Sequence, residues 1–171
     1  MSAPARGDPA AAHLPDGSIE IVPVETSADL RDALEIRRRV FSLEQGVADL
    51  RVADPDDARS LIALARMRRE RDGHVETRPV ATGRLTPSPL AGGPALVAWV
   101  ATLPEFRGQG IGHALMRYLL DAADHAGIRE VTLAAQAPAE RFYRRLGFTT
   151  AGPHYDVRGI PHVRMVRHRL F

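Results

Sequence analysis

An apolar run followed at once by a glycine-rich turn and a helix restricts the fold of this 171-residue chain most. The run Ala95–Leu103 is the most apolar stretch and predicts a central buried strand. The turn Arg107–Gly112 follows it, and a helix is predicted over His113–Ala126. Glycines at alternate positions let main-chain N–H groups converge on an anion in front of the helix. The unit therefore predicts a pyrophosphate cradle, with a tight connecting loop as the alternative.

The remaining elements indicate one mixed sheet covered by helices. Residues 1–17, rich in Ala, Pro and Gly, are predicted to be a disordered tail, and residues 18–171 a single domain. Before the apolar run we expect a strand at 19–24, a helix capped by Ser27, and strands at Leu61–Met67 and about Arg78–Leu85. After the glycine turn and its helix we expect a strand at Val131–Ala134, a helix at Pro138–Leu146 and strands at about 148–157 and 162–169.

Composition excludes several classes of function. The chain has no cysteine, which removes disulfides, thiolate nucleophiles and zinc–thiolate sites. All 23 basic residues are arginine and 21 residues are acidic, so a net charge of +2 argues against a nucleic-acid partner. His154, His162 and His168 are too widely spaced for a recognisable metal site, so no metal is expected. No apolar stretch approaches membrane-spanning length and no signal pattern opens the chain, which predicts a cytoplasmic protein without a membrane partner.

The glycine turn does not fit the two commonest phosphate-binding motifs. A dinucleotide fingerprint needs a third glycine where the chain has His113, and a P-loop needs a lysine that the chain lacks. What remains, with Arg107, Gly110 and Gly112, resembles the Arg/Gln-x-x-Gly-x-Gly/Ala signature of the GNAT superfamily of N-acetyltransferases. The segment from Ala139 to Phe148 is similar to a second element of that superfamily, A-x-x-F-Y-x-x-x-G-F.

Further segments are similar to the ElaA-like branch of that superfamily, namely Phe41–Val47, Ala135-Gln136 and Gly159–His162 with Met165. The resemblance covers about residues 19–169 and implies an α/β (mixed α+β) GNAT-like domain. Such a domain has a mixed, mostly antiparallel sheet of about six to seven strands and about four helices. It also implies transfer of an acetyl group from acetyl-CoA to an amine, directly within a ternary complex. A non-catalytic acyl-CoA-binding module is the alternative.

The resemblance also implies which residues bind acetyl-CoA. In this superfamily the central strand parts from its neighbour at a bulge, and the pantetheine arm pairs with the exposed edge. The implied main-chain contacts are those of Ala101, Thr102 and Leu103, unless the strands stay paired there. The implied pyrophosphate contacts are Arg107, Gly108, Gln109, Gly110, Ile111 and Gly112, with Gln136 as a further cofactor contact. Arg107 could instead be a surface arginine in a salt bridge.

Catalysis needs a base for the amine proton and an acid for the leaving thiolate. Glu44 is the first candidate base and His162 the second; alternatively Glu44 caps a helix end and His162 is a structural strand histidine. Tyr143 is the candidate acid, because a phenol with a pKa near 10 keeps its proton at neutral pH. The alternative for Tyr143 is a tyrosine packed for its ring.

Two groups of charged residues do not identify the amine that accepts the acetyl group. Four carboxylates, Asp49, Asp54, Asp56 and Asp57, lie on one loop and are either solvated or a field that attracts a cationic amine. Arg37–Arg39 and Arg66–Arg71 are expected to pair with nearby acids. We expect a small-molecule or peptide amine as acceptor, and a monomer or a homodimer.

Overall fold

The computed structural model describes residues 10–14 and 17–169, with side chains from residue 17 onward. Within these ranges one sheet holds eight strands in the order β1-β2-β3-β4-β5-β6-β8-β7. In chain order they are Ala10–Leu14, Gly17–Pro23, Leu61–Arg71, His74–Thr86, Ala95–Thr102, Glu130–Gln136, Thr149–Val157 and Ile160–His168. All neighbours are antiparallel except β5 and β6, which are parallel. The mixed, mostly antiparallel sheet expected from the sequence is therefore confirmed.

The strand count exceeds the expected six to seven because residues 10–14, assigned to a disordered tail, form β1. This strand pairs with β2 from Ala10↔Ile21 to Leu14↔Gly17. Main-chain hydrogen bonds build such a ladder, so an edge strand can form without the apolar alternation that predicts strands from sequence. The rest of the predicted tail, residues 1–9 and 15–16, lies outside the described residues.

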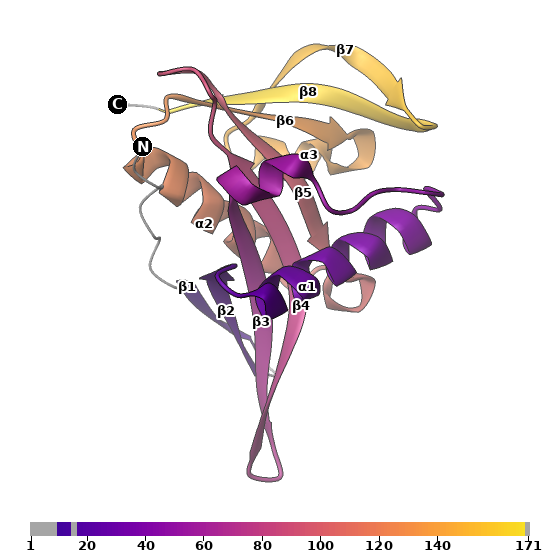
Figure 1. Cartoon of the computed structure of the whole chain (residues 1–171), viewed down its shortest axis with the longest axis vertical. Coiled ribbons are helices and arrows are strands. Elements are labelled where there is room, and N and C mark those ends of the chain that lie inside the picture. The colour runs from indigo at the N-terminus through magenta and orange to yellow at the C-terminus, as the bar shows by residue number, and fades with distance from the viewer. Residues whose placement is uncertain (1–9, 15–16, 170–171) are drawn as a thin grey trace.

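Helices cover both faces of the sheet, α1 (Ser27–Arg37) in front and α2 (Ile111–His125) behind in Figure 1. Strand alternation explains this arrangement, because the Cα position of Gly83 faces Leu115 and Leu119 of α2, whereas Arg84 faces the α1 side. The N-cap of α1 is Thr26 rather than Ser27, and it forms a reciprocal capping box with Asp29.

Short helical segments connect the strands and the longer helices. A π-helix, η1 (Arg38–Glu44), continues α1, and the 3-10 turns are η2 (Pro55–Arg59), η3 (Pro104–Phe106) and η4 (Ala137–Ala139). The helix expected over Pro138–Leu146 divides into η4 and the short α3 (Glu140–Arg144). The described part of the chain thus has three α-helices and one π-helix where about four helices were expected.

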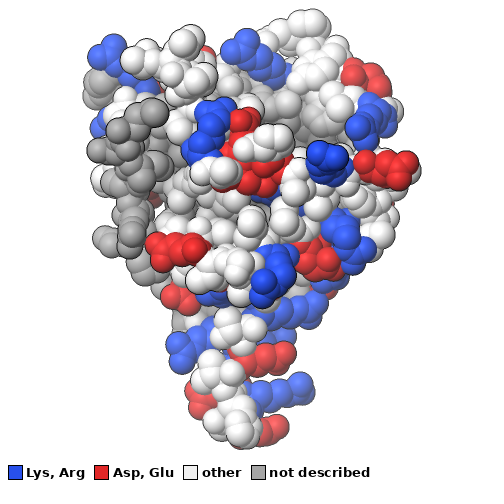
Figure 2. All heavy atoms as spheres, viewed as in Figure 1, with Lys and Arg blue, Asp and Glu red and all other residues white. Residues whose placement is uncertain are grey.

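Charged side chains of both signs are interspersed on the face shown in Figure 2. All three arginines of the first cluster pair with acids as expected: Arg37 with Asp57, Arg38 with Glu35 and Arg39 with Glu105. In the second cluster, Arg66–Arg71, the ion pair found among the described residues is that of Arg66 with Asp29. Of the helices in the described ranges, none has the length and apolar character needed to span a membrane.

Candidate active site

The pairing of β5 with β4 is interrupted by a β-bulge. Thr82 pairs with Ala101 and Arg84 with Ala98, so Gly83 alone lies opposite Trp99 and Val100. Trp99 has φ +56°, a left-handed conformation that a bulky side chain adopts only when its surroundings hold it there. On the other side, β5 pairs with β6 only at Ala95 and Leu96. The two parallel strands therefore diverge beyond Leu96, as the resemblance implied.

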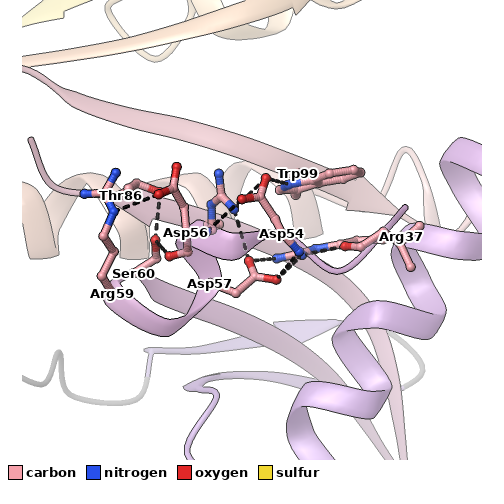
Figure 3. A network of polar contacts seen from close by, with 10 residues as sticks. Arg37, Asp54, Asp56, Asp57, Arg59, Ser60, Thr86 and Trp99 are labelled. Atoms are coloured by element: carbon pink, nitrogen blue, oxygen red, sulfur yellow. Dashed lines mark hydrogen bonds and ion pairs between the residues drawn. The ribbon is translucent and has the colours of Figure 1, made fainter. Parts of the chain in front are cut away.

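A polar network on the α1 side holds Trp99 (Figure 3). The indole Nε1 donates to Asp54 Oδ2 at 3.0 Å. The guanidinium of Arg37 lies over the indole ring, 5.0 Å from its centroid, and the Phe41 ring meets it edge-on at 5.3 Å. Each of these contacts constrains the ring, so the network holds Trp99 in its place in the bulge.

Two arginines at the centre of this network are fully removed from solvent. Arg37 is 0% exposed and Arg84 is 2% exposed. Asp57 receives both terminal nitrogens of Arg37, at 2.9 and 3.0 Å, and one from Arg84 at 3.1 Å. Asp54 also lies 3.0 Å from Arg84. Burial alone would raise the pKa of Asp57, but the hydrogen bonds from Arg37, from the main-chain N–H of Asp54 and from Arg84 outweigh it and hold the pKa below its usual value.

This pairing answers the question about the acidic loop. Asp54 and Asp57 are neither freely solvated nor available to attract a cationic amine, because they neutralise the two buried arginines. Asp56 pairs with Arg59 on the surface and Asp49 is exposed. Local sequence predicted that Arg37 pairs with an acid, but not that Arg37 and Arg84 are buried or that Trp99 binds Asp54. Nothing local marks a residue as buried when its partner lies 20 or more positions away.

The divergence of β5 and β6 opens a cleft of about 820 Å³. Eleven of the sequence-predicted site residues line it: Glu44, Ala101, Thr102, Arg107, Gly108, Gly110, Ile111, Gly112, Gln136, Tyr143 and His162. Leu103 and Gln109 do not line it. The structure therefore brings together residues that the sequence separates by more than 100 positions.

The exposed main-chain edge of β5 is shorter than expected. The N–H of Leu103 donates to Val80 O on β4 at 2.9 Å, and its carbonyl accepts from Phe106 N. Because neighbouring strand residues direct their main-chain groups to opposite sides, those of Thr102 face the β6 side. Those of Ala101, which pairs with Thr82, face β4 as those of Leu103 do. The free edge here is thus that of Thr102, and the implied contacts from the Ala101 and Leu103 main chain are not available.

The glycine turn has the backbone geometry of an anion cradle. Gly108 and Gly110 have φ +75° and +79°, and a Cβ added to either would meet no atom within 4 Å. Gly110 is the N-cap of α2, and no side chain of the described residues caps the helix there. The first N–H groups of α2 therefore point into the cleft without a capping partner, where the helix dipole favours negative charge. Open space beside free donors fits a pyrophosphate.

Glu44 and Arg107 form a two-pronged ion pair, with Oε1 and Oε2 at 2.6 and 2.7 Å from the guanidinium. Arg107 also donates from Nε to the Thr102 carbonyl at 2.9 Å. The hydrogen bond from Arg107 lowers the pKa of Glu44, and the same pair raises the pKa of Arg107. A carboxylate held this way accepts a proton poorly, so the geometry argues against Glu44 as the base. The salt-bridge alternative for the Arg107 side chain is the one found.

His162 lines the cleft, and one of its ring nitrogens is held by the main chain. Its Nδ1 lies 2.8 Å from the Ile160 carbonyl, which can only accept, so Nδ1 carries the proton in the neutral ring. Among the described residues Nε2 has no hydrogen-bond partner, so its lone pair is available as an acceptor. The ring stacks on Tyr155 of β7, with centroids 6.2 Å apart, which fixes its plane.

Tyr143 lies on α3, which packs on the start of α2: a Cβ at Gly112 would lie 3.6 Å from the Phe142 ring. The Tyr143 side chain is 8% exposed and lines the cleft. Burial raises the pKa of its phenol to about 12. Within the described residues its hydroxyl makes no hydrogen bond. The phenol therefore keeps its proton and has that proton to donate.

Comparison with known proteins identifies a matching family model and several relatives. A family model described as the acetyltransferase (GNAT) domain matches residues 93–168. YyaT of Bacillus subtilis is 30% identical over 148 residues, which span 84% of this chain and 92% of that protein. ElaA of Escherichia coli is 30% identical over 135 residues, 78% of this chain and 84% of ElaA.

Solved structures have the same fold over nearly their whole length. The crystal structure of Escherichia coli ElaA superposes with a TM-score of 0.74 and 26% identity, covering 88% of this chain and 99% of that one. An acyl-CoA N-acyltransferase from Pseudomonas aeruginosa superposes with a TM-score of 0.72 and 29% identity, covering 87% and 99%.

Proposed function

Because this chain belongs to the GNAT family of acetyltransferases, we propose that it transfers an acetyl group from acetyl-CoA directly to an amine. The observation that carries the proposal is the uncapped glycine turn at Gly108 and Gly110, which opens into the cleft where β5 and β6 diverge. Acetyl-CoA, when bound, supplies the acetyl group in activated form as a thioester.

Different segments of the chain bind different parts of acetyl-CoA. The N–H groups at the start of α2, with Gly108 and Gly110, hold the pyrophosphate. The free edge of β5 at Thr102 holds the pantetheine arm as an added strand would be held. Without a cysteine the chain can form no cysteinyl acyl-enzyme, which supports direct transfer.

Two side chains of the cleft move the protons. His162 Nε2 accepts the proton that the amine must lose before it attacks, because its lone pair is free while Nδ1–H is held by the Ile160 carbonyl. Tyr143 donates its phenolic proton to the leaving sulfur, and its raised pKa keeps it protonated until that moment. This assignment replaces Glu44 with His162 as the base.

A panel of amines with acetyl-CoA, read by release of free CoA thiol, tests the proposal. The panel should include small amines, antibiotics, peptide N-termini and lysine side chains. Thiol release that depends on one class of acceptor supports catalysis. Binding of acetyl-CoA without release for any acceptor would instead favour the non-catalytic acyl-CoA-binding module.

Acetyl-CoA should stabilise the folded chain. At a ligand concentration of 100 times Kd, we expect about 2.7 kcal/mol of added stability, seen as a rise of several degrees in Tm. NAD and ATP should raise Tm much less, because neither carries a pantetheine arm for the β5 edge. Equal shifts from NAD and acetyl-CoA would contradict the assignment.

Replacing Gly110 by valine should abolish acetyl-CoA binding while the chain stays folded. The added side chain would project into the open space of the cradle and strain a backbone at φ +79°, at a cost of about 1–3 kcal/mol. Gly127→Val is the matched control, since Gly127 has φ +72° and equally open surroundings at the other end of α2. Isothermal titration calorimetry measures the acetyl-CoA affinity of both variants. If Gly110→Val binds acetyl-CoA within about twofold of the control, the cradle lies elsewhere.

A further inference from the structure

Two consecutive residues at the end of η1 reach to opposite walls of the cleft. Glu44 pairs with Arg107, which follows the end of β5. Gln45 pairs with Gln136, the last residue of β6. Because β5 and β6 pair only at their first residues, no ladder joins them at this end. The segment Glu44-Gln45, here called the strap, is a side-chain bridge between the ends of the two diverging strands.

The Gln45–Gln136 contact is a reciprocal pair of carboxamides. Gln45 Nε2 donates to Gln136 Oε1 at 3.1 Å, and Gln136 Nε2 donates to Gln45 Oε1 at 2.9 Å. Each carboxamide spends one N–H and one lone pair on the other and keeps one of each. Two bonds between planar groups also fix both side chains, which as single glutamines would have several rotatable bonds.

Glu44, the other residue of the strap, is held by a separate set of contacts. The Glu44–Arg107 pair uses two charge-assisted bonds, and Arg107 is itself held by the Thr102 carbonyl. The main-chain N–H of Gln45 donates to the Val40 carbonyl at 3.1 Å, and this bond closes the last turn of η1. Gln45 therefore approaches Gln136 from a fixed backbone position rather than from a free loop.

We propose that Gln45 is a positioning residue for acyl-CoA that acts through Gln136. Acyl-CoA carries two secondary amides along its pantetheine arm, and an amide needs one donor and one acceptor. The oriented carboxamide of Gln136, with one N–H and one lone pair left, supplies both on the β6 wall opposite the free edge at Thr102. The inference rests on the proposed function, because it assumes that the cleft binds acyl-CoA.

Titration of wild type, Gln45→Ala, Gln136→Ala and the double variant with two ligands tests this inference. The ligands are CoA and 3′-phosphoadenosine 5′-diphosphate, which has the phosphates but no pantetheine arm. Gln45→Ala should weaken CoA binding about three- to tenfold, the effect of one or two lost hydrogen bonds, and leave the nucleotide ligand within twofold. The double variant should bind CoA no more weakly than Gln136→Ala, since Gln45 acts only through its partner. Leu43→Ala, a 62% exposed neighbour in η1, is the matched control and should bind both ligands as wild type does.

Each other result overturns the inference. Unchanged CoA binding by Gln45→Ala would show that Gln136 needs no partner. Equal loss of both ligands would mean that the strap only supports the fold. Additive losses in the double variant would mean that Gln45 acts on its own. If wild type itself does not bind CoA, the proposed function fails first, and the inference fails with it.

Discussion

Tyr143→Phe is expected to lower kcat by about 10- to 1000-fold with little change in CoA affinity or folding. The substitution keeps the ring, which meets Phe142 and Phe148 edge-on at 5.0 and 6.0 Å, and removes only the hydroxyl. Tyr143 lines the cleft, and its hydroxyl has no hydrogen-bond partner in the described part of the chain. Because burial raises its pKa to about 12, it is protonated throughout the neutral range. Single-turnover kinetics with an accepted amine measures the effect on chemistry.

Tyr118→Phe is the control for losing a hydroxyl, since Tyr118 is buried in α2 outside the cleft. Its kcat should stay at the wild-type value. The kcat ratio of wild type to Tyr143→Phe should also stay constant from about pH 6 to 9, because the phenol does not ionise there. An unchanged kcat in Tyr143→Phe, with chemistry limiting turnover, would leave Tyr143 a residue packed for its ring.

Asp57→Ala is expected to destabilise the fold by about 3–5 kcal/mol, or about 6–20 °C in Tm. Removing this carboxylate leaves Arg37, 0% exposed, without its two-pronged partner and takes one of two carboxylates from Arg84. Within the described ranges the Nε atoms of both arginines are already buried without a hydrogen-bond partner. The remaining charges therefore have little further compensation. Urea unfolding followed by circular dichroism measures the loss.

Asp56→Ala is the matched control from the same turn. Its carboxylate pairs with Arg59 on the surface, where both side chains are at least 40% exposed. Such a pair contributes about 0–1 kcal/mol, so the control should stay near wild type. Equal effects of the two substitutions would show that burial of the arginines does not make Asp57 special.

The same network predicts how stability depends on acid. The pKa values of Asp54 and Asp57 are lowered in the folded chain, so both carboxylates stabilise it fully above their ordinary pKa of 3.8. As pH falls below that value the unfolded chain binds protons first, and stability decreases until the folded carboxyls are protonated. The decrease should be smaller in Asp57→Asn, which has no carboxyl to titrate at that position. Unfolding curves at several pH values below 5 measure the difference.

Element order and the cradle were predictable because both depend on local sequence. Glycine at positions 108 and 110 permits φ values near +75°, and the apolar run before them forms a strand in the middle of the sheet as predicted, although it is half-buried rather than buried throughout. The pattern from Ala139 to Phe148 likewise places Tyr143 on a helix beside the cradle. Strand ends were predicted less well: β3 and β4 extend as a hairpin beyond the body of the molecule (Figure 1), where no core alternation marks them.

The roles of charged and polar side chains depend on partners far along the chain. Glu44 meets Arg107 63 positions away, and Gln45 meets Gln136 91 positions away. No local pattern indicates such pairs, so local sequence left Glu44 as either a candidate base or a helix cap, and the acidic loop as either solvated or a field that attracts a cationic amine. Pairing in three dimensions changes the proton affinity and the exposure of each group at once.

The sequence by itself determined the family, through its motifs. It also determined the order of the strands and α-helices from residue 17 onward and the backbone of the glycine turn, because glycine and apolar spacing act through local conformation. Only the tertiary structure decided which acid neutralises which buried arginine, why β5 bulges at Trp99 and which side of His162 is free. These outcomes depend on distances between segments, and the Coulomb and hydrogen-bond energies that govern them vanish unless the fold brings the groups together.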